Sequence, residues 1–236
     1  MRWKTHKLLT RMALAKANLG YTFRRIILDH INDLDRERKT YETHHKVPLN
    51  RIMNYIWKAR RLYLQGKLGS SAISLSYAIH LIQDRLTPAG TLHDRYEKEI
   101  DDIVSKRDFF IPSKIPIISS PNYIENMLKR SLSVRNLRKR VSWAYVLTNL
   151  VADATFTRNE NIKELIHRFD DAKRRHGKLA AISILIALFS SLILAIILDP
   201  LGFLLPLIFA YIIVRSDSTY YRLEKEVKWN DPDYPA

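Results

Sequence analysis

The chain contains no cysteine, and this absence limits both its covalent chemistry and its metal chemistry. Disulfide bonds and thiolate metal sites are excluded. Any zinc site must therefore use histidine and carboxylate ligands, as catalytic zinc sites with an open coordination position commonly do. We also expect no signal peptide, because the basic start through Lys7 is followed by a segment that carries Arg11 and Lys16 and has no signal-type apolar core.

Alternation of apolar and polar residues, the pattern of β-strands, is also scarce. It never runs longer than four or five residues, and the chain has no internal repeat. Apolar residues recur instead at helical spacing through most of the sequence. We therefore expect an all-α fold, with helices at about 3–19, 48–65, 69–86, 91–106, 122–139 and 142–157.

The C-terminal third changes character. Residues 179–198 form a run of 20 without a charged side chain, long enough to cross a hydrocarbon core of about 30 Å. A turn and a second apolar run, broken by Pro206, follow. We expect a transmembrane hairpin over residues 177–216, tight or partly re-entrant, with spans at about 179–198 and 201–215. A buried helix pair in a soluble protein is the less favoured alternative, since the first run is apolar on every face.

Positive charge indicates the partners and the orientation of the chain. The net charge of +15 favours anionic partners such as phospholipid head groups, nucleic acid or other phosphate esters. Basic residues flank the hairpin, whereas its short turn has none. By the positive-inside rule we expect the N-terminal domain (residues 1–176) and the tail (residues 217–236) on the cytoplasmic side. The flanking basic residues are Lys173, Arg174, Arg175, Lys178, Arg215 and Arg222.

Two histidines each precede a carboxylate by four residues, His80 with Asp84 and His93 with Glu97. Residues i and i+4 share one helix face, with Cβ atoms about 5–6 Å apart, so each pair can hold one metal ion. The turn-forming residues 87–90 would place the two pairs on adjoining antiparallel helices. A surface salt link is the common alternative for such a pair. However, residues 74–84 are mostly apolar, and a buried carboxylate is costly unless it is paired or bound to metal.

Further candidate ligands precede these pairs. His6 lies in the first expected helix, Asp29 stands beside His30, and a charged segment ends in His44 and His45. Imidazole and carboxylate ligands together suit zinc or a similar divalent ion.

This ordered series on an all-α chain resembles the zinc-dependent phospholipase C and S1/P1 nuclease superfamily. The best match is residues 78–88, which resemble the family's His-x-x-x-Asp helix and its Thr/Pro turn. The resemblance covers about residues 1–106 and implies a multi-helix phospholipase C/P1 nuclease-like domain over residues 1–176. Two features depart from the family pattern: Trp3 follows Met1 and Arg2 instead of standing first, and Gly90 stands where a further histidine is common.

Carried over to this chain, the resemblance implies a site for one to three Zn²⁺ ions. Asp29 would also be the general base, and His45 remains an alternative to His44. The implied metal ligands are His6, Asp29, His44, His80, Asp84, His93 and Glu97.

The function implied by the resemblance is hydrolysis of a phosphodiester by a metal-activated water. A membrane hairpin would hold the site near head groups, which favours membrane lipid as the substrate. A nuclease on the same scaffold is one alternative, because residues 129–140 are rich in lysine and arginine, although a solvated helix face explains that stretch more simply. A non-catalytic membrane protein with a degenerate metal site is the other.

Overall fold

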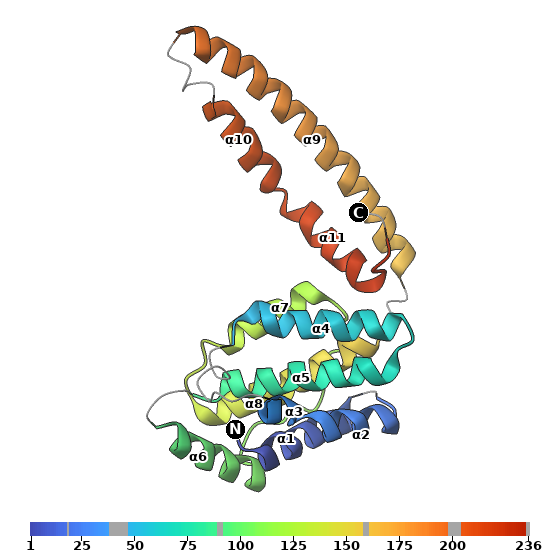
Figure 1. Ribbon diagram of the computed structural model, residues 1–236, viewed down its shortest axis with the longest axis vertical. Helices are drawn as coiled ribbons and strands as arrows, with labels where there is room; N and C mark the ends of the chain where they lie inside the picture. Colours follow the sequence, from blue (N-terminus) through green and yellow to red (C-terminus); the bar gives the residue numbers. More distant parts are fainter. Residues whose placement is uncertain (18, 38–46, 89–91, 158–160, 198–203, 235–236) are drawn as a thin grey trace. The chain divides into compact units, whose positions relative to one another are not determined.

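The structure is a computed structural model that describes residues 1–17, 19–37, 47–88, 92–157, 161–197 and 204–234 (Figure 1). Within these ranges it contains helices and no strand, which confirms the all-α expectation. The chain divides into two compact units, Met1–Asn159 and Glu160–Ala236. The boundary predicted at residue 176 falls inside one long helix of the second unit.

The first unit is built around one central helix. Its helices are α1 (Trp3–Lys16), α2 (Tyr21–His30), α3 (Asp33–Glu37), α4 (Leu49–Leu64), α5 (Leu68–Leu86), α6 (His93–Lys106), α7 (Pro121–Ser131) and α8 (Leu137–Phe156). Helix α5 packs against α2, α4 and α8. Small residues on α5 allow this close packing, and Ser71 and Ser74 donate hydrogen bonds to α4 carbonyl oxygens at 2.7 and 3.1 Å.

Two helical predictions needed correction. The segment expected as one helix over 122–139 is broken: α7 ends at Ser131, where the Ser131 and Ser133 hydroxyls donate to the carbonyls of Leu128 and Arg130. The side chain of Asn136 then caps the start of α8 by accepting from the Lys139 N–H. The first helix also ends at Lys16 and not near residue 19, and α2 and α3 cover a region for which no helix was expected.

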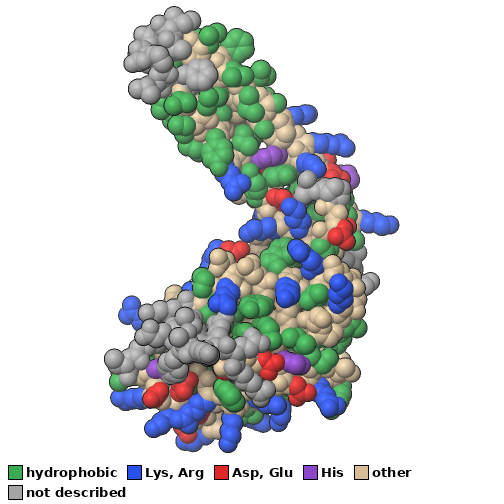
Figure 2. Space-filling model, in the orientation of Figure 1, with side chains coloured by type: hydrophobic (Ala, Val, Ile, Leu, Met, Phe, Trp, Pro, Cys, Tyr) green, Lys and Arg blue, Asp and Glu red, His purple; other side chains and the backbone are tan. Residues whose placement is uncertain are grey.

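The second unit contains one helix that is long and apolar enough to cross a membrane. Its helices are α9 (Ile162–Ile197), α10 (Leu204–Arg215) and α11 (Ser218–Asn230). The 18-residue window of α9 has a mean hydropathy of 2.1 and is only 17% buried. Large apolar side chains such as Leu185, Phe189 and Phe209 are exposed on α9 and α10, and apolar side chains cover the face seen in Figure 2. Such a surface is unfavourable in water.

Helices α9 and α10 lie side by side (Figure 1) and pack through small residues. Ser183, Ala187 and Ser191 follow one another at intervals of four on α9 and are buried, as is Ala210 on α10. Small residues at this spacing let two helix backbones approach closely, which is the usual basis of helix association in lipid.

The start of α9 packs instead against α11. Phe169 and Ala172 of α9 form an apolar cluster with Leu223 and Val227 of α11. One continuous helix, α9, thus carries both the apolar cluster with α11 and the contact with α10.

Asp217 caps α11 and contacts His176 on α9, so we expect its replacement to destabilise α11. Its carboxylate accepts the Tyr220 N–H at 3.1 Å as the N-cap of α11 and lies 3.1 Å from His176 Nδ1. In Asp217→Ala we expect hydrogen exchange in α11 to be about 5-fold faster, since a lost N-cap costs about 1 kcal/mol. Asp217→Asn, which keeps the cap, is the control. Equal exchange in all three proteins would contradict the capping role.

The stabilising effect of Asp217 is also expected to depend on pH. Burial raises the pKa of this carboxyl, but the Tyr220 N–H and His176 outweigh it and lower the pKa overall. The stabilisation is therefore complete above the unfolded-state pKa of about 3.9 and is lost as the pH falls through the lower folded-state value.

Candidate metal centre

Four helices of the first unit bring histidines and carboxylates together. His6 comes from α1 and Asp35 from α3, while α5 and α6 contribute the two His-x-x-x-carboxylate pairs. We call these six residues the histidine–carboxylate cluster: His6, Asp35, His80, Asp84, His93 and Glu97.

The pair on α5 forms the middle of the cluster. His80 Nε2 lies 3.0 Å from Asp84 Oδ2 and 3.0 Å from Asp35 Oδ1. His80 is fully buried and Asp84 is 3% exposed. The i,i+4 spacing read from the sequence therefore does place an imidazole and a carboxylate against each other in the interior.

His6 completes a group of three with His80 and Asp35. Its ring stacks on His80 with centroids 4.4 Å apart, and its Nε2 lies 3.0 Å from Asp84 Oδ1. One ligand atom each from His6, Asp35 and His80 lies within 4.8 Å of the others, which is a separation that one metal ion can bridge.

The pair on α6 reaches the same region through the amino group of Met1. His93 Nε2 lies 3.2 Å from Glu97 Oε1, and the Met1 amino nitrogen lies 2.8 Å from that same oxygen. The amino nitrogen is also 3.5 Å from Asp84 Oδ1. A buried amine thus links the carboxylates of the two pairs.

Hydrogen bonds behind His6 determine which of its nitrogens faces the cluster. The Gln83 side-chain amide donates to Thr10 Oγ1 at 2.9 Å and Thr148 Oγ1 at 3.3 Å, so its oxygen is the atom turned toward His6. His6 Nδ1 lies 2.8 Å from that oxygen and must therefore donate. In the neutral ring this leaves the Nε2 lone pair directed at the cluster, as in metal-ligating histidines.

His93 is held in the same tautomer. Its Nδ1 lies 2.9 Å from the carbonyl oxygen of Pro88, an atom that can only accept. The N–H is therefore on Nδ1, and Nε2 of the neutral ring carries the lone pair on the side of Glu97.

These tautomers fit a cation in the cluster. His6 Nε2 is buried and faces the Asp84 carboxylate, with 3.0 Å between Nε2 and Oδ1. A lone pair and a carboxylate oxygen repel each other unless a proton or a metal ion lies between them. Two ligands on a tetrahedral zinc ion with bonds of 2.0–2.2 Å are roughly 3.3–3.6 Å apart, so the nitrogen–oxygen separations of 3.0 Å here need to widen only slightly to admit the ion.

Electrostatics in the cluster also favour a positive charge. Burial opposes protonation of His80, but the carboxylates of Asp84 and Asp35 outweigh it and raise its pKa to about 9. Burial and the neighbouring His80 lower the pKa of His6. Burial raises the pKa of Asp84, yet the two histidines hold it well below its usual value. Asp84 is therefore ionised at neutral pH, and protonated His80 and the Met1 amino group supply positive charge beside it.

The structure places one predicted ligand, Asp29, elsewhere. Asp29 does not join the histidines; its side chain is 56% exposed and its carboxylate lies 3.8 Å from Arg25 Nε. Asp35, six residues later on α3, contacts His80 instead, and we therefore replace Asp29 by Asp35 in the ligand set. His44 and its alternative His45 lie outside the described residues.

Sequence reasoning missed Asp35 and Gln83 for different reasons. Asp35 is one of three carboxylates close together in the sequence, with Asp29 and Asp33. Which of them reaches the histidines depends on how the chain turns after α2. Gln83 could have been found, because a polar residue beside Asp84 in an otherwise apolar helix must have a buried partner.

No family model, curated protein or solved structure matches the chain. The metal centre is therefore inferred from the contacts of its side chains, and the resemblance to the phospholipase C and P1 nuclease superfamily stays a prediction.

Replacing Gln83 is expected to weaken metal binding without removing a ligand. In Gln83→Leu the His6 N–H loses its acceptor, so the ring is no longer held in the tautomer that presents Nε2. Loss of such a supporting hydrogen bond typically costs 10- to 100-fold in metal affinity. Zinc titration against a competing chelator measures the change. Gln83→Glu, which retains an acceptor oxygen, should bind within a few fold of wild type; equal affinity in both variants and wild type would contradict this role.

Proposed function

We propose that this chain is a membrane-anchored, metal-dependent phosphoester hydrolase of the phospholipase C type. The observation that carries the proposal is the buried His6 Nε2, held as a lone-pair donor against the carboxylate of Asp84. Either a proton or a metal ion between Nε2 and Oδ1 satisfies this arrangement, and the metal ion is the occupant that we propose.

Zinc is the metal that fits the donor set best, with one to three ions. His6, Asp35, His80 and Asp84 would hold the first ion, and His93 and Glu97 a further one. When bound, such ions lower the pKa of a coordinated water and neutralise phosphate oxygens. Histidine and carboxylate ligands without thiolates are typical of catalytic zinc sites.

Asp35 is the best candidate for the general base in place of Asp29. Its side chain is 21% exposed, against 4% for Asp84 and 16% for Glu97, so it is the cluster carboxylate most open to solvent. Burial raises its pKa, but the hydrogen bond with His80 outweighs this and lowers the pKa, which keeps Asp35 ionised at neutral pH. Asp35 can thus accept a proton from water at the open side of the cluster.

A membrane lipid is the substrate class that we propose. Helices α9 and α10 would form a transmembrane hairpin, with the first unit and α11 on the cytoplasmic side, because basic residues flank both helices. An enzyme tethered in this way meets phosphodiesters of phospholipids at high local concentration.

A nuclease is the less favoured function, because internal contacts occupy much of the basic stretch at 129–140. Lys129 pairs with Glu125 at 2.6 Å and Arg138 with Asp108 at 2.7 Å. Arg140 donates to the carbonyls of Val134 and Leu86. The basic stretch therefore has less positive charge available to bind the phosphates of a nucleic acid.

The test measures first the metal content of the protein and then which of two substrates it cleaves. Protein purified in neutral detergent and washed with a mild chelator should retain at least one equivalent of zinc by elemental analysis. It should then release phosphocholine from phosphatidylcholine and leave single-stranded DNA intact. Cleavage of DNA alone would favour the nuclease, while zinc without either activity would favour a binding protein. Absence of retained metal would overturn the proposal.

A further inference from the structure

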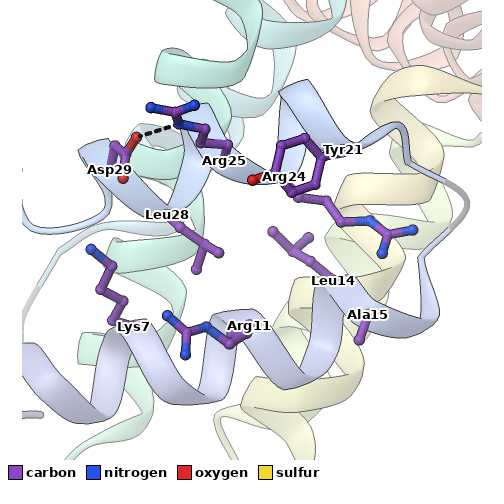
Figure 3. Close-up of a pocket in the computed structure, with 9 residues that line it drawn as sticks. All are labelled: Lys7, Arg11, Leu14, Ala15, Tyr21, Arg24, Arg25, Leu28 and Asp29. Atoms are coloured by element: carbon purple, nitrogen blue, oxygen red, sulfur yellow. Dashed lines mark ion pairs between the residues drawn. The ribbon is translucent and has the colours of Figure 1, made fainter.

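A second polar site lies between α1 and α2. It is a pocket of about 430 Å³ lined by nine residues, four of them basic (Figure 3). Lys7 and Arg11 come from α1, while Arg24 and Arg25 come from α2. None of these side chains belongs to the histidine–carboxylate cluster.

The positive charge of this pocket is poorly balanced by the protein. Asp29 is its single carboxylate, and that carboxylate lies 3.8 Å from Arg25 Nε (Figure 3). Lys7 and Arg11 have no ion pair within the described part of the chain, and they stand four residues apart on one helix face. Like charges at this spacing destabilise a helix, and a bound anion would relieve the repulsion.

Arg24 provides a donor that the protein does not satisfy. Its Nη2 donates to the carbonyl oxygen of Ala17 at 3.3 Å, which anchors the guanidinium at the end of α1. Its Nε is buried and makes no hydrogen bond with any residue that the structure describes. A buried N–H without a partner is costly, and an oxygen of a ligand in the pocket would satisfy it.

Apolar groups complete the lining. Leu14 and Leu28 lie between the two basic pairs, and the Tyr21 side chain is 79% exposed at the edge (Figure 3). The volume is within the usual range for small-ligand sites, about 300–1,000 Å³, and exceeds what a bare phosphate needs. A phosphate attached to a small organic group would contact both the basic side chains and the two leucines.

We propose that this pocket binds a phosphate monoester anion, supplied by a phospholipid head group or by a soluble phosphate. A monoester carries a charge of about −1.5 to −2 near neutral pH and three acceptor oxygens, which matches several lysine and arginine donors better than a singly charged diester does. Binding here needs no metal, so it is independent of the proposed catalytic centre.

Calorimetric titration of the metal-free, full-length protein in neutral detergent tests the site. One arm uses inorganic phosphate, and the other uses a short-chain phosphatidic acid below its micelle concentration. We expect both to bind, more weakly as salt is added. Tighter binding of the lipid would identify a head group as the source, and equal binding would identify a soluble phosphate.

The variant Lys7→Gln/Arg11→Gln should bind both ligands at least about tenfold more weakly, because it loses two charge-assisted contacts. Lys58→Gln/Arg61→Gln on α4, with the same charge change at exposed positions, is the control and should bind like wild type. A cooperative melting transition close to that of wild type shows that the pocket variant is folded, and phosphate should raise the melting temperature of wild type and not of the variant. Wild-type affinity in the pocket variant, equal losses in both variants, or no binding by wild type would overturn the proposal.

Discussion

Replacing His80 and Asp84 together by alanine is expected to leave a folded protein without retained zinc and with phosphodiester hydrolysis lowered by about 1,000-fold or more. Asp84 faces both His6 and His80, and His80 faces both Asp84 and Asp35, each at 3.0 Å. The double variant therefore removes the two residues that His6 and Asp35 contact. A metal centre supplies several kcal/mol of transition-state stabilisation, and each 1.36 kcal/mol is tenfold in rate.

The double variant is chosen because a single one would leave a buried charge less well compensated. Without Asp84, a protonated His80 would lose one of the two carboxylates that lie 3.0 Å from it, and a poorly compensated charge in the interior destabilises the fold by itself. Elemental analysis, hydrolysis rate and melting temperature are the three readouts. A chelator should lower the melting temperature of wild type and leave that of the variant unchanged, since binding to the folded state alone stabilises it.

A matched control is the pair His30 and Asp33, whose Nδ1 and Oδ2 atoms are 2.6 Å apart at the α2–α3 turn. This pair has similar chemistry but is more exposed and lies outside the cluster. His30→Ala/Asp33→Ala should keep wild-type zinc content and activity. Zinc retained by the His80/Asp84 variant, or lost from the control alone, would contradict the assignment of the centre.

If α9 and α10 form the proposed transmembrane hairpin, two arginines in the apolar part of α9 are expected to release the protein from the membrane. Leu185 and Phe189 are 57% and 70% exposed, so their replacement leaves the contact between α9 and α10 untouched. Each arginine near the middle of a span costs about 2.5–3.5 kcal/mol of insertion free energy. For Leu185→Arg/Phe189→Arg this is enough to move most of the protein out of the bilayer.

Alkaline extraction of membranes measures this outcome. Wild type and Leu185→Ala/Phe189→Ala should stay in the pellet, because alanine shortens the side chains without adding charge. The arginine variant should appear in the supernatant or as aggregate. Extraction of wild type by alkali would mean that α9 and α10 are not embedded and that their apolar surface is covered by protein.

Several features could be predicted from local sequence. Helical periodicity predicted the all-α fold, and the uncharged run at 179–198 predicted an apolar helix that the structure contains. The His80–Asp84 and His93–Glu97 contacts follow from i,i+4 spacing, because a helix fixes the relative positions of residues one turn apart. The boundaries were less accurate, since Ser131, Ser133 and Asn136 end and restart a helix through side-chain hydrogen bonds.

Long-range features could not be predicted in this way. The choice of Asp35 over Asp29 depends on where the chain turns between α2 and α3, and on which face of α2 is directed at α5. Asp29 instead lies beside Arg25, on the face that lines the basic pocket. Spacing along the chain does not distinguish the two carboxylates.

The sequence by itself determined the all-α fold, the apolar length of α9 and the two pairs within one helix turn, because these depend on neighbours no more than a few residues apart. Only the tertiary structure decided the orientation of His6 by Gln83, the meeting of both pairs at the Met1 amino group, and the placement of Lys7, Arg11, Arg24 and Arg25 around one pocket. The physical reason is that these contacts join separate helices. Their geometry is set by how buried side chains of α1, α2, α5 and α6 pack together, which no local pattern encodes.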